Sequence, residues 1–143
     1  MNRKIWLCLI CFVQLARAES ISDAEKWIST AVPDGWRYDQ AQKCWHNDTN
    51  EMAVALKSRP LESDLKAWAL TLAQPSARAK IEDFTLGGQP AKRVRYVNAA
   101  GYQTTIWITA KKKRGALLTL VHRSQESADS VRDQLLGQFR WLR

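Results

Sequence analysis

The chain has 143 residues, of which 22 are basic and 14 acidic, giving a formal net charge of +8. This length suits one domain with one hydrophobic core, and the absence of any linker or internal repeat excludes a multidomain arrangement. A basic balance suits an anionic partner, such as a phospholipid surface, a cell-wall polymer, nucleic acid or an acidic protein, and it also suits a surface that only maintains solubility.

The N-terminus has the pattern of an export signal over residues 1–18. A basic start precedes an apolar stretch over residues 5–13 and the small-x-small cleavage site Ala16-Arg17-Ala18. A transmembrane helix needs about 20 apolar residues, so this stretch is too short to remain as an anchor. We therefore expect cleavage after Ala18, one mature domain over residues 19–143 without a transmembrane segment, and a periplasmic location with secretion as the alternative. Export argues against a nucleic-acid partner.

Cleavage also changes the charge and the cysteine content. The leader carries three of the 22 basic residues and none of the 14 acidic ones, so the mature domain has a net charge of +5. Cys44 becomes the only cysteine, which excludes an internal disulfide. In an oxidising compartment such a free thiol is either buried and inert or available to another molecule, and burial is the commoner case.

The first half of the mature chain mixes helical and strand patterns. Apolar residues at helical spacing predict a helix over residues 22–31, with Ser22 and Glu25 as a capping box. Short strands are expected at 36–39 and 43–46, and a longer central strand at 51–58. A second helix is expected over residues 62–74, because apolar residues follow the i, i+4, i+7, i+11 pattern at Leu61, Leu65, Trp68 and Leu72.

The second half contains four consecutive strand patterns, at residues 80–86, 91–97, 102–110 and 116–122. The connections are too short for parallel crossovers, so an antiparallel meander is expected. A final helix over residues 125–137 would bury a stripe that extends to an apolar tail; the stripe consists of Ala128, Val131, Leu135 and Phe139. The resulting order, α-β-β-β-α-β-β-β-β-α, is α+β with helices packed on an antiparallel sheet.

Three features resemble the PsbP-like family, which includes the Ran-binding Mog proteins and DUF1795-type bacterial envelope relatives. They are the turn at residues 32–36 (Val-Pro-Asp-Gly-Trp), the turn at 86–91 (Leu-Gly-Gly-Gln-Pro-Ala) that leads into a long hairpin, and a closing helix that ends in Phe139. The resemblance covers about residues 20–142. It implies an α/β/α sandwich used mostly for binding partners and assisting assemblies, without catalysis or cofactors. Unlike the lipoprotein members, this chain has no convincing acylation site.

Residues Cys44, His46 and Asp48 alternate and would share one face of an extended segment. These side chains could ligate zinc or copper, or the imidazole could activate the thiol. The spacing is generic, and a buried cysteine beside a surface histidine is the simpler interpretation. The sequence also lacks a Gly-x-Ser-x-Gly elbow, a His-Glu-x-x-His helix and a phosphate-binding glycine loop. We therefore expect no enzymatic activity and no bound metal.

A cluster of cations and one aromatic residue is the candidate contact surface. The basic run lies at a predicted hairpin tip, with two arginines and an indole on nearby strands: Lys111, Lys112, Lys113, Arg114, Arg93, Arg95 and Trp107. Arginine and aromatic residues are typical anchors of protein interfaces. The alternatives are a lysine-rich turn that only prevents edge aggregation, a tryptophan covered by a helix, and a sugar-binding stack of Tyr96, Tyr102 and Trp107.

Three functional hypotheses follow. The leading one is an exported, non-enzymatic protein that binds another envelope or secreted protein stoichiometrically, as an accessory, inhibitory or immunity-type partner, for example in a secretion system. The second is a module that binds anionic lipid or cell-wall glycan. The third is a thiol or metal enzyme centred on Cys44 and His46.

Overall fold

The computed structural model describes residues 17–49, 51–123 and 125–143, apart from the side chains of residues 125–127. The export signal predicted for residues 1–18 lies outside this part, except for its last two residues. The described elements, in chain order, are β1 (Ala18–Ser22), β2 (Ile28–Pro33), β3 (Arg37–Asp39), β4 (Cys44–His46), β5 (Met52–Pro60), α2 (Leu65–Ala73), β6 (Lys80–Leu86), β7 (Gln89–Val97), β8 (Gln103–Lys111), β9 (Arg114–His122), α3 (Gln125–Gln138) and β10 (Arg140–Trp141).

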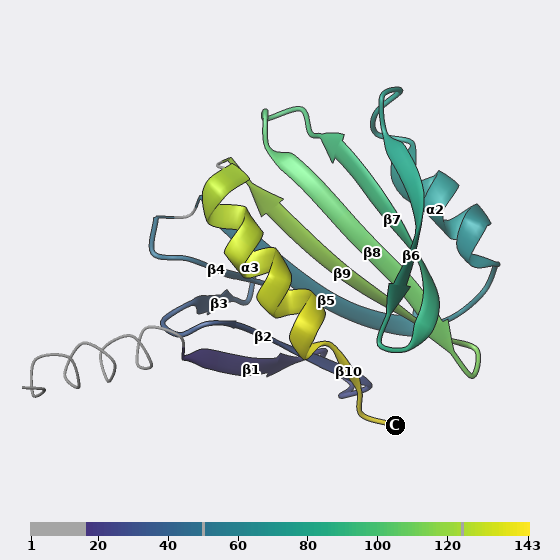
Figure 1. The fold of residues 1–143 in the computed structure, drawn as a ribbon, viewed down its shortest axis with the longest axis horizontal. Coiled ribbons are helices and arrows are strands. Elements are labelled where there is room, and N and C mark those ends of the chain that lie inside the picture. Colours follow the sequence, from purple (N-terminus) through teal and green to yellow (C-terminus); the bar gives the residue numbers. More distant parts are fainter. Residues whose placement is uncertain (1–16, 50, 124) are drawn as a thin grey trace, which may run out of the picture.

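In the part of the chain that the structure describes, two antiparallel sheets and two helices form three layers. The larger sheet has the strand order β3-β4-β5-β9-β8-β7-β6, and the smaller one has the order β1-β2-β10. Helix α3 and the small sheet lie on one face of the large sheet, whereas α2 covers the other face (Figure 1). This architecture confirms the predicted α+β class. Among the described residues, no helix is both long enough and apolar enough to cross a membrane.

The strands from β6 to β9 form the predicted four-stranded meander. Each pairs antiparallel with the next, and the central strand of the first half, β5, pairs with β9 over its full length. The β8–β9 connection is a tight turn in which Lys112 and Lys113 have positive φ angles of 50° and 67°. Two successive residues in this region are typical of a type I′ hairpin turn, whose twist matches that of the strands.

The helix predicted over residues 22–31 is wrong, because this segment forms the β1–β2 hairpin. The side chain of Asp23 accepts hydrogen bonds from the backbone N–H groups of Trp27 and Ile28, at 2.8 and 2.9 Å. Lys26 has a φ of 57°, which is incompatible with a right-handed helix. Local side-chain capture of backbone donors therefore replaces the helical hydrogen bonds. The alternation of β-branched Ile28, Thr30 and Val32, all buried, is the strand signal that the helical pattern obscured.

Each face of the large sheet has its own apolar core. On the α3 face, the predicted stripe of Ala128, Val131, Leu135 and Phe139 is buried throughout, which confirms that helix and its orientation. On the other face, α2 packs Trp68 and Ala69 against Val94, Ile106 and Ile108. Trp107 points to the α3 side and is fully buried, so the interpretation of an exposed indole is wrong.

Candidate functional site

A buried carboxylate anchors the β1–β2 loop next to the large sheet. Asp23 is 4% exposed, and besides two backbone N–H groups it accepts a hydrogen bond from the Ser58 hydroxyl on β5, at 2.6 Å. Burial of a charged group is costly unless it is hydrogen-bonded, and here all three donors approach the same side chain. Asp23 thus joins the small sheet to the large one.

Arg114 extends this polar network. Its guanidinium donates to Ser58 Oγ at 3.1 Å and forms an ion pair with Glu25. The same guanidinium lies 4.7 Å from the ring centre of Trp27, and Arg143 stacks on that ring at 4.4 Å. The sequence assigned Arg114 to an exposed basic tip. The structure instead turns its side chain inward, leaving 12% exposed, so it serves the packing of the loop.

An open groove of about 460 Å³ lies beside this network. Its walls come from the β1–β2 loop and from strands β3, β4 and β5, and it is lined in part by Tyr38, Trp45, Lys43 and Lys57. The rings of Tyr38 and Trp45 lie 4.7 Å apart at an angle of 57°, and Tyr38 is 46% exposed. No described carboxylate forms an ion pair with either lysine, whereas the acidic residues of the groove, Asp23 and Glu25, are already engaged. The groove therefore offers aromatic surface and two lysines that have no ion-pair partner among the described carboxylates.

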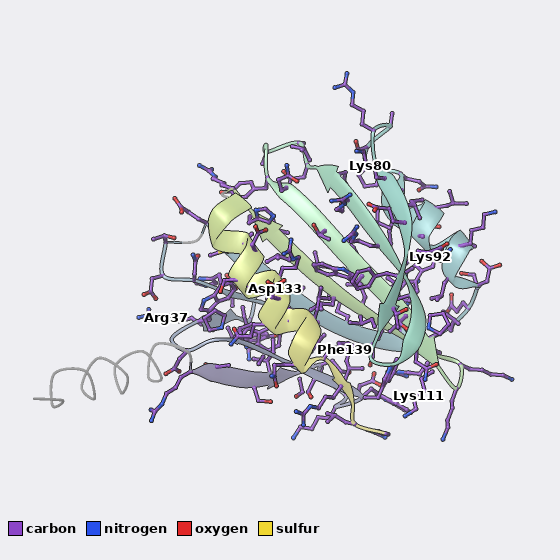
Figure 2. The ribbon with its side chains drawn as sticks, viewed as in Figure 1. Arg37, Lys80, Lys92, Lys111, Asp133 and Phe139 are labelled. Atoms are coloured by element: carbon purple, nitrogen blue, oxygen red, sulfur yellow. The ribbon has the colours of Figure 1, made fainter. Side chains whose placement is uncertain are left out.

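Of the remaining cations of the predicted tip, Lys112 and Lys113 are exposed and Lys111 is half-buried. Lys112 and Lys113 form the β8–β9 turn, and Lys111 ends β8 at the opposite end of the sheet from Lys80 (Figure 2). Arg114 connects this tip to the groove, because Arg114 follows the turn and bonds to Glu25 and Ser58 of the groove wall. The tip and the groove are therefore neighbouring surfaces.

The other predicted contact residues lie under α3, away from the tip. Arg93 and Trp107 are direct cross-strand partners, and Arg95 lies beside them on β7. Glu82 bridges the two arginines, accepting from Arg93 Nη2 at 2.8 Å and from Arg95 Nε at 3.0 Å. These hydrogen bonds hold the pKa of the Glu82 carboxyl below its usual value. The seven predicted residues therefore belong to two separate places and do not form one surface. The proposed sugar-binding stack is also not formed, because Trp107 is buried and Tyr102 is paired with Arg123.

The structure shows no hydrogen bond among Cys44, His46 and Asp48 in the described part of the chain. Cys44 is a buried free thiol, and burial raises its pKa, an effect reinforced by the nearby charge of Asp39. His46 Nδ1 donates to the Asn47 carbonyl oxygen at 3.1 Å, and Asp48 lies in the turn after β4. Within the described ranges, no three His, Cys, Asp or Glu side chains could hold a metal ion.

The environment of Cys44 predicts slow alkylation in the folded protein. Since the thiolate is the nucleophile, burial and a raised pKa both reduce its reaction with iodoacetamide. We expect the native rate constant at pH 8 to be at least about tenfold below that in denaturant, with the pH midpoint of reactivity shifted upward. Mass spectrometry of quenched samples measures both quantities. Native and denatured rates that agree within twofold would contradict the prediction.

Sequence reasoning missed the groove and its anchor. The helical pattern includes Asp23, although an aspartate side chain can equally hydrogen-bond to nearby backbone N–H groups and so stabilise a turn. Tyr38 and Trp45 lie on strands of three residues each. Such strands are too short for the alternation of side chains to show which face is exposed. Their juxtaposition follows from the β3–β4 register, in which Tyr38 opposes Trp45.

Comparison with known proteins identifies the fold. No protein-family model and no curated protein matches the chain. Among solved structures, the cyanobacterial PsbP (CyanoP) of Synechocystis sp. PCC 6803 superposes with a TM-score of 0.61 at 12% identity, over 88% of this chain and 93% of that one. LpqN of Mycobacterium tuberculosis, which is involved in cell envelope biogenesis, gives 0.52 at 14% identity, over 87% and 90%. A protein of Bacteroides thetaiotaomicron VPI-5482 gives 0.59 at 12% identity, over 87% of this chain and 48% of that one. The chain has the PsbP-like fold that the sequence motifs indicated.

Proposed function

We propose that this PsbP-like domain is exported to the bacterial envelope, where it binds another envelope or secreted protein stoichiometrically and catalyses no reaction. The groove carries the proposal. It combines the exposed ring of Tyr38 and the half-buried ring of Trp45 with Lys43 and Lys57, which form no ion pair with a described carboxylate. Such a site suits an acidic segment bearing an apolar or aromatic side chain. The export signal predicted from the sequence and the PsbP-like fold, which is shared with a protein involved in cell envelope biogenesis, support the location.

The contact surface proposed here differs from the one expected from the sequence. Arg93, Arg114 and Trp107 are engaged in internal contacts, so the groove replaces them as the main contact. The exposed Lys112 and Lys113 at the neighbouring tip extend the basic surface. An accessory, inhibitory or immunity-type role remains the proposed outcome of that binding.

A photo-crosslinking amino acid placed at Tyr38 in living cells tests the groove directly. We expect a discrete protein adduct from this position and none from the same probe at Leu70, which is 55% exposed on α2. Lys43→Gln with Lys57→Gln should lower the adduct yield about fivefold, because each exposed charge contributes on the order of 0.5 kcal/mol. The matched control, Lys66→Gln with Lys80→Gln, removes two exposed lysines elsewhere and should leave the yield unchanged. Equal adducts from Tyr38 and Leu70, or no protein adduct, would overturn the proposal.

A second candidate function, binding to anionic lipid, is favoured by the exposed β8–β9 tip. Lysines near an anionic membrane contribute about 1 kcal/mol each. Sedimentation with phosphatidylglycerol vesicles should then fall steeply with salt and depend on Lys112 and Lys113, without any protein partner. Salt-independent sedimentation, or none, would exclude this alternative.

A further inference from the structure

A second, smaller pocket lies between α3 and the large sheet. It has a volume of about 60 Å³, roughly twice the ~30 Å³ that one water molecule occupies in the liquid. Strands β7, β8 and β9 form its floor, and α3 contributes Ala128, Asp129 and Arg132. Trp107, which is fully buried, lines it together with the exposed Arg95 and Gln103. The pocket therefore connects the solvent with the interior of the sheet.

Two residues that line the pocket each have a buried N–H donor for which no described residue provides an acceptor. They are the indole Nε1 of Trp107 and the Nε of Arg93, each with essentially no exposed surface. A buried donor without an acceptor costs roughly 1–3 kcal/mol, so two in one pocket require an explanation. The nearest carboxylate on β6, Glu82, bonds to Arg93 Nη2 and to Arg95 and does not reach Arg93 Nε.

Charged side chains surround the pocket. Three arginines line it, Arg93, Arg95 and Arg132. Three carboxylates form ion pairs with them: Glu82 on β6 with Arg93 and Arg95, and Asp129 and Asp133 on α3 with Arg132. His122 also lines the pocket and has its own interaction. The arginines and carboxylates balance in number, and Asp133 is the most exposed of the carboxylates, at 71% of its side chain.

We propose that this pocket binds a small oxyanion, a phosphate or carboxylate group, whose oxygens accept hydrogen bonds from Trp107 Nε1 and Arg93 Nε. Arg93, Arg95 and Arg132, which line the pocket, supply the positive charge that attracts it. The volume suits one such group, and hydrogen bonds from charged donors to an anion are among the strongest in proteins. This site is separate from the groove, so a protein partner and an oxyanion can bind together.

Titration with inorganic phosphate, followed by the indole ¹H–¹⁵N resonances, tests the site. The protein is kept in a chloride buffer of constant ionic strength, and Trp107→Phe assigns the Trp107 signal. We expect that signal to shift in a saturable manner at millimolar phosphate. Arg132→Gln, on the accessible helix, should weaken binding at least about tenfold. Arg37→Gln, which removes an exposed arginine at the far edge of the sheet, should leave the affinity unchanged (Figure 2).

A parallel titration with acetate distinguishes the two sources of oxyanion. Tighter binding of phosphate indicates a phosphate ligand, and tighter binding of acetate indicates a carboxylate. If the Trp107 resonance does not shift with either anion, or if it shifts equally in Arg132→Gln, the pocket holds ordered water only and the proposal is wrong. The result does not depend on the groove, since Tyr38 crosslinking reports on that site alone.

Discussion

Replacing Asp23 with alanine is expected to lower the free energy of unfolding by about 3 kcal/mol. The change leaves the backbone N–H groups of Trp27 and Ile28 and the Ser58 hydroxyl without their acceptor, and hydrogen bonds to a charged group contribute roughly 1.5–3 kcal/mol each. The expected loss is smaller than the sum of these three contributions. The loop can open in the variant, and water can then form hydrogen bonds with some of the groups that lose Asp23. Urea denaturation followed by tryptophan fluorescence measures the effect.

Asp23→Asn is the matched control. Its amide oxygen can still accept from the two backbone N–H groups, while its amide nitrogen cannot accept from Ser58 Oγ. We therefore expect a loss of about 1 kcal/mol, near the value of a single neutral hydrogen bond. An alanine variant within 0.5 kcal/mol of the asparagine variant would show that the carboxylate does not anchor the hairpin, and the account of why residues 22–31 avoid a helix would fail with it.

Gly87→Ala is expected to cost about 2.5 kcal/mol, against about 1 kcal/mol for Gly88→Ala. Both glycines have positive φ angles, 57° and 77°, where an L side chain carries a penalty on the order of 1 kcal/mol. They differ in their surroundings. A Cβ at Gly87 would lie 2.8 Å from Phe139 Cε1, whereas one at Gly88 meets nothing within 4 Å. The extra cost at Gly87 is overpacking against a buried ring.

A double-mutant cycle with Phe139→Leu separates overpacking from backbone strain. The smaller leucine should accommodate the new methyl group, so the combined cost should fall below the sum of the single costs by about 1 kcal/mol. Thermal denaturation of the four proteins provides the comparison. Equal costs for Gly87→Ala and Gly88→Ala, with strict additivity, would mean that the turn does not press on Phe139.

The Gly87 contact brings together two of the motifs on which the PsbP-like resemblance rests. The Gly-Gly turn between β6 and β7 approaches Phe139, which follows the last turn of α3. A glycine at the turn permits the ring of Phe139 to close the core at this end of the sheet. Residues about 50 positions apart thus form a single packing unit.

The elements that the sequence predicted well are those in which local preference and burial agree. In β6 to β9, turn residues bound each strand and short connections allow only antiparallel pairing, so the meander is confirmed. The stripe of α3 is confirmed because its helical period matches the face it buries. The segment at residues 22–31 has both a helical period and a β-branched alternation. There, the contact of Asp23 with Ser58, 35 residues away, supports the strand outcome.

The candidate site was less predictable, because a side chain's accessibility depends on what packs over it. Arg114 and Lys113 are adjacent in one basic run, yet Arg114 turns inward to Glu25 while Lys113 faces solvent. Glu25 lies 89 residues from Arg114, and no local pattern reveals that pairing. Trp107 is similar, because either a helix or solvent could cover its face until the position of α3 is known.

The sequence by itself determined the α+β class, the antiparallel meander and the α3 stripe, since these follow from residue period and turn chemistry. Only the tertiary structure decided the β1–β2 hairpin, the groove beside Tyr38 and Trp45, and the separation of the basic tip from the arginines under α3. The physical reason is the distance along the chain over which each effect acts. Period and turn preference act over a few residues, whereas the pairing of a buried charge and the covering of a sheet face join segments far apart in the chain.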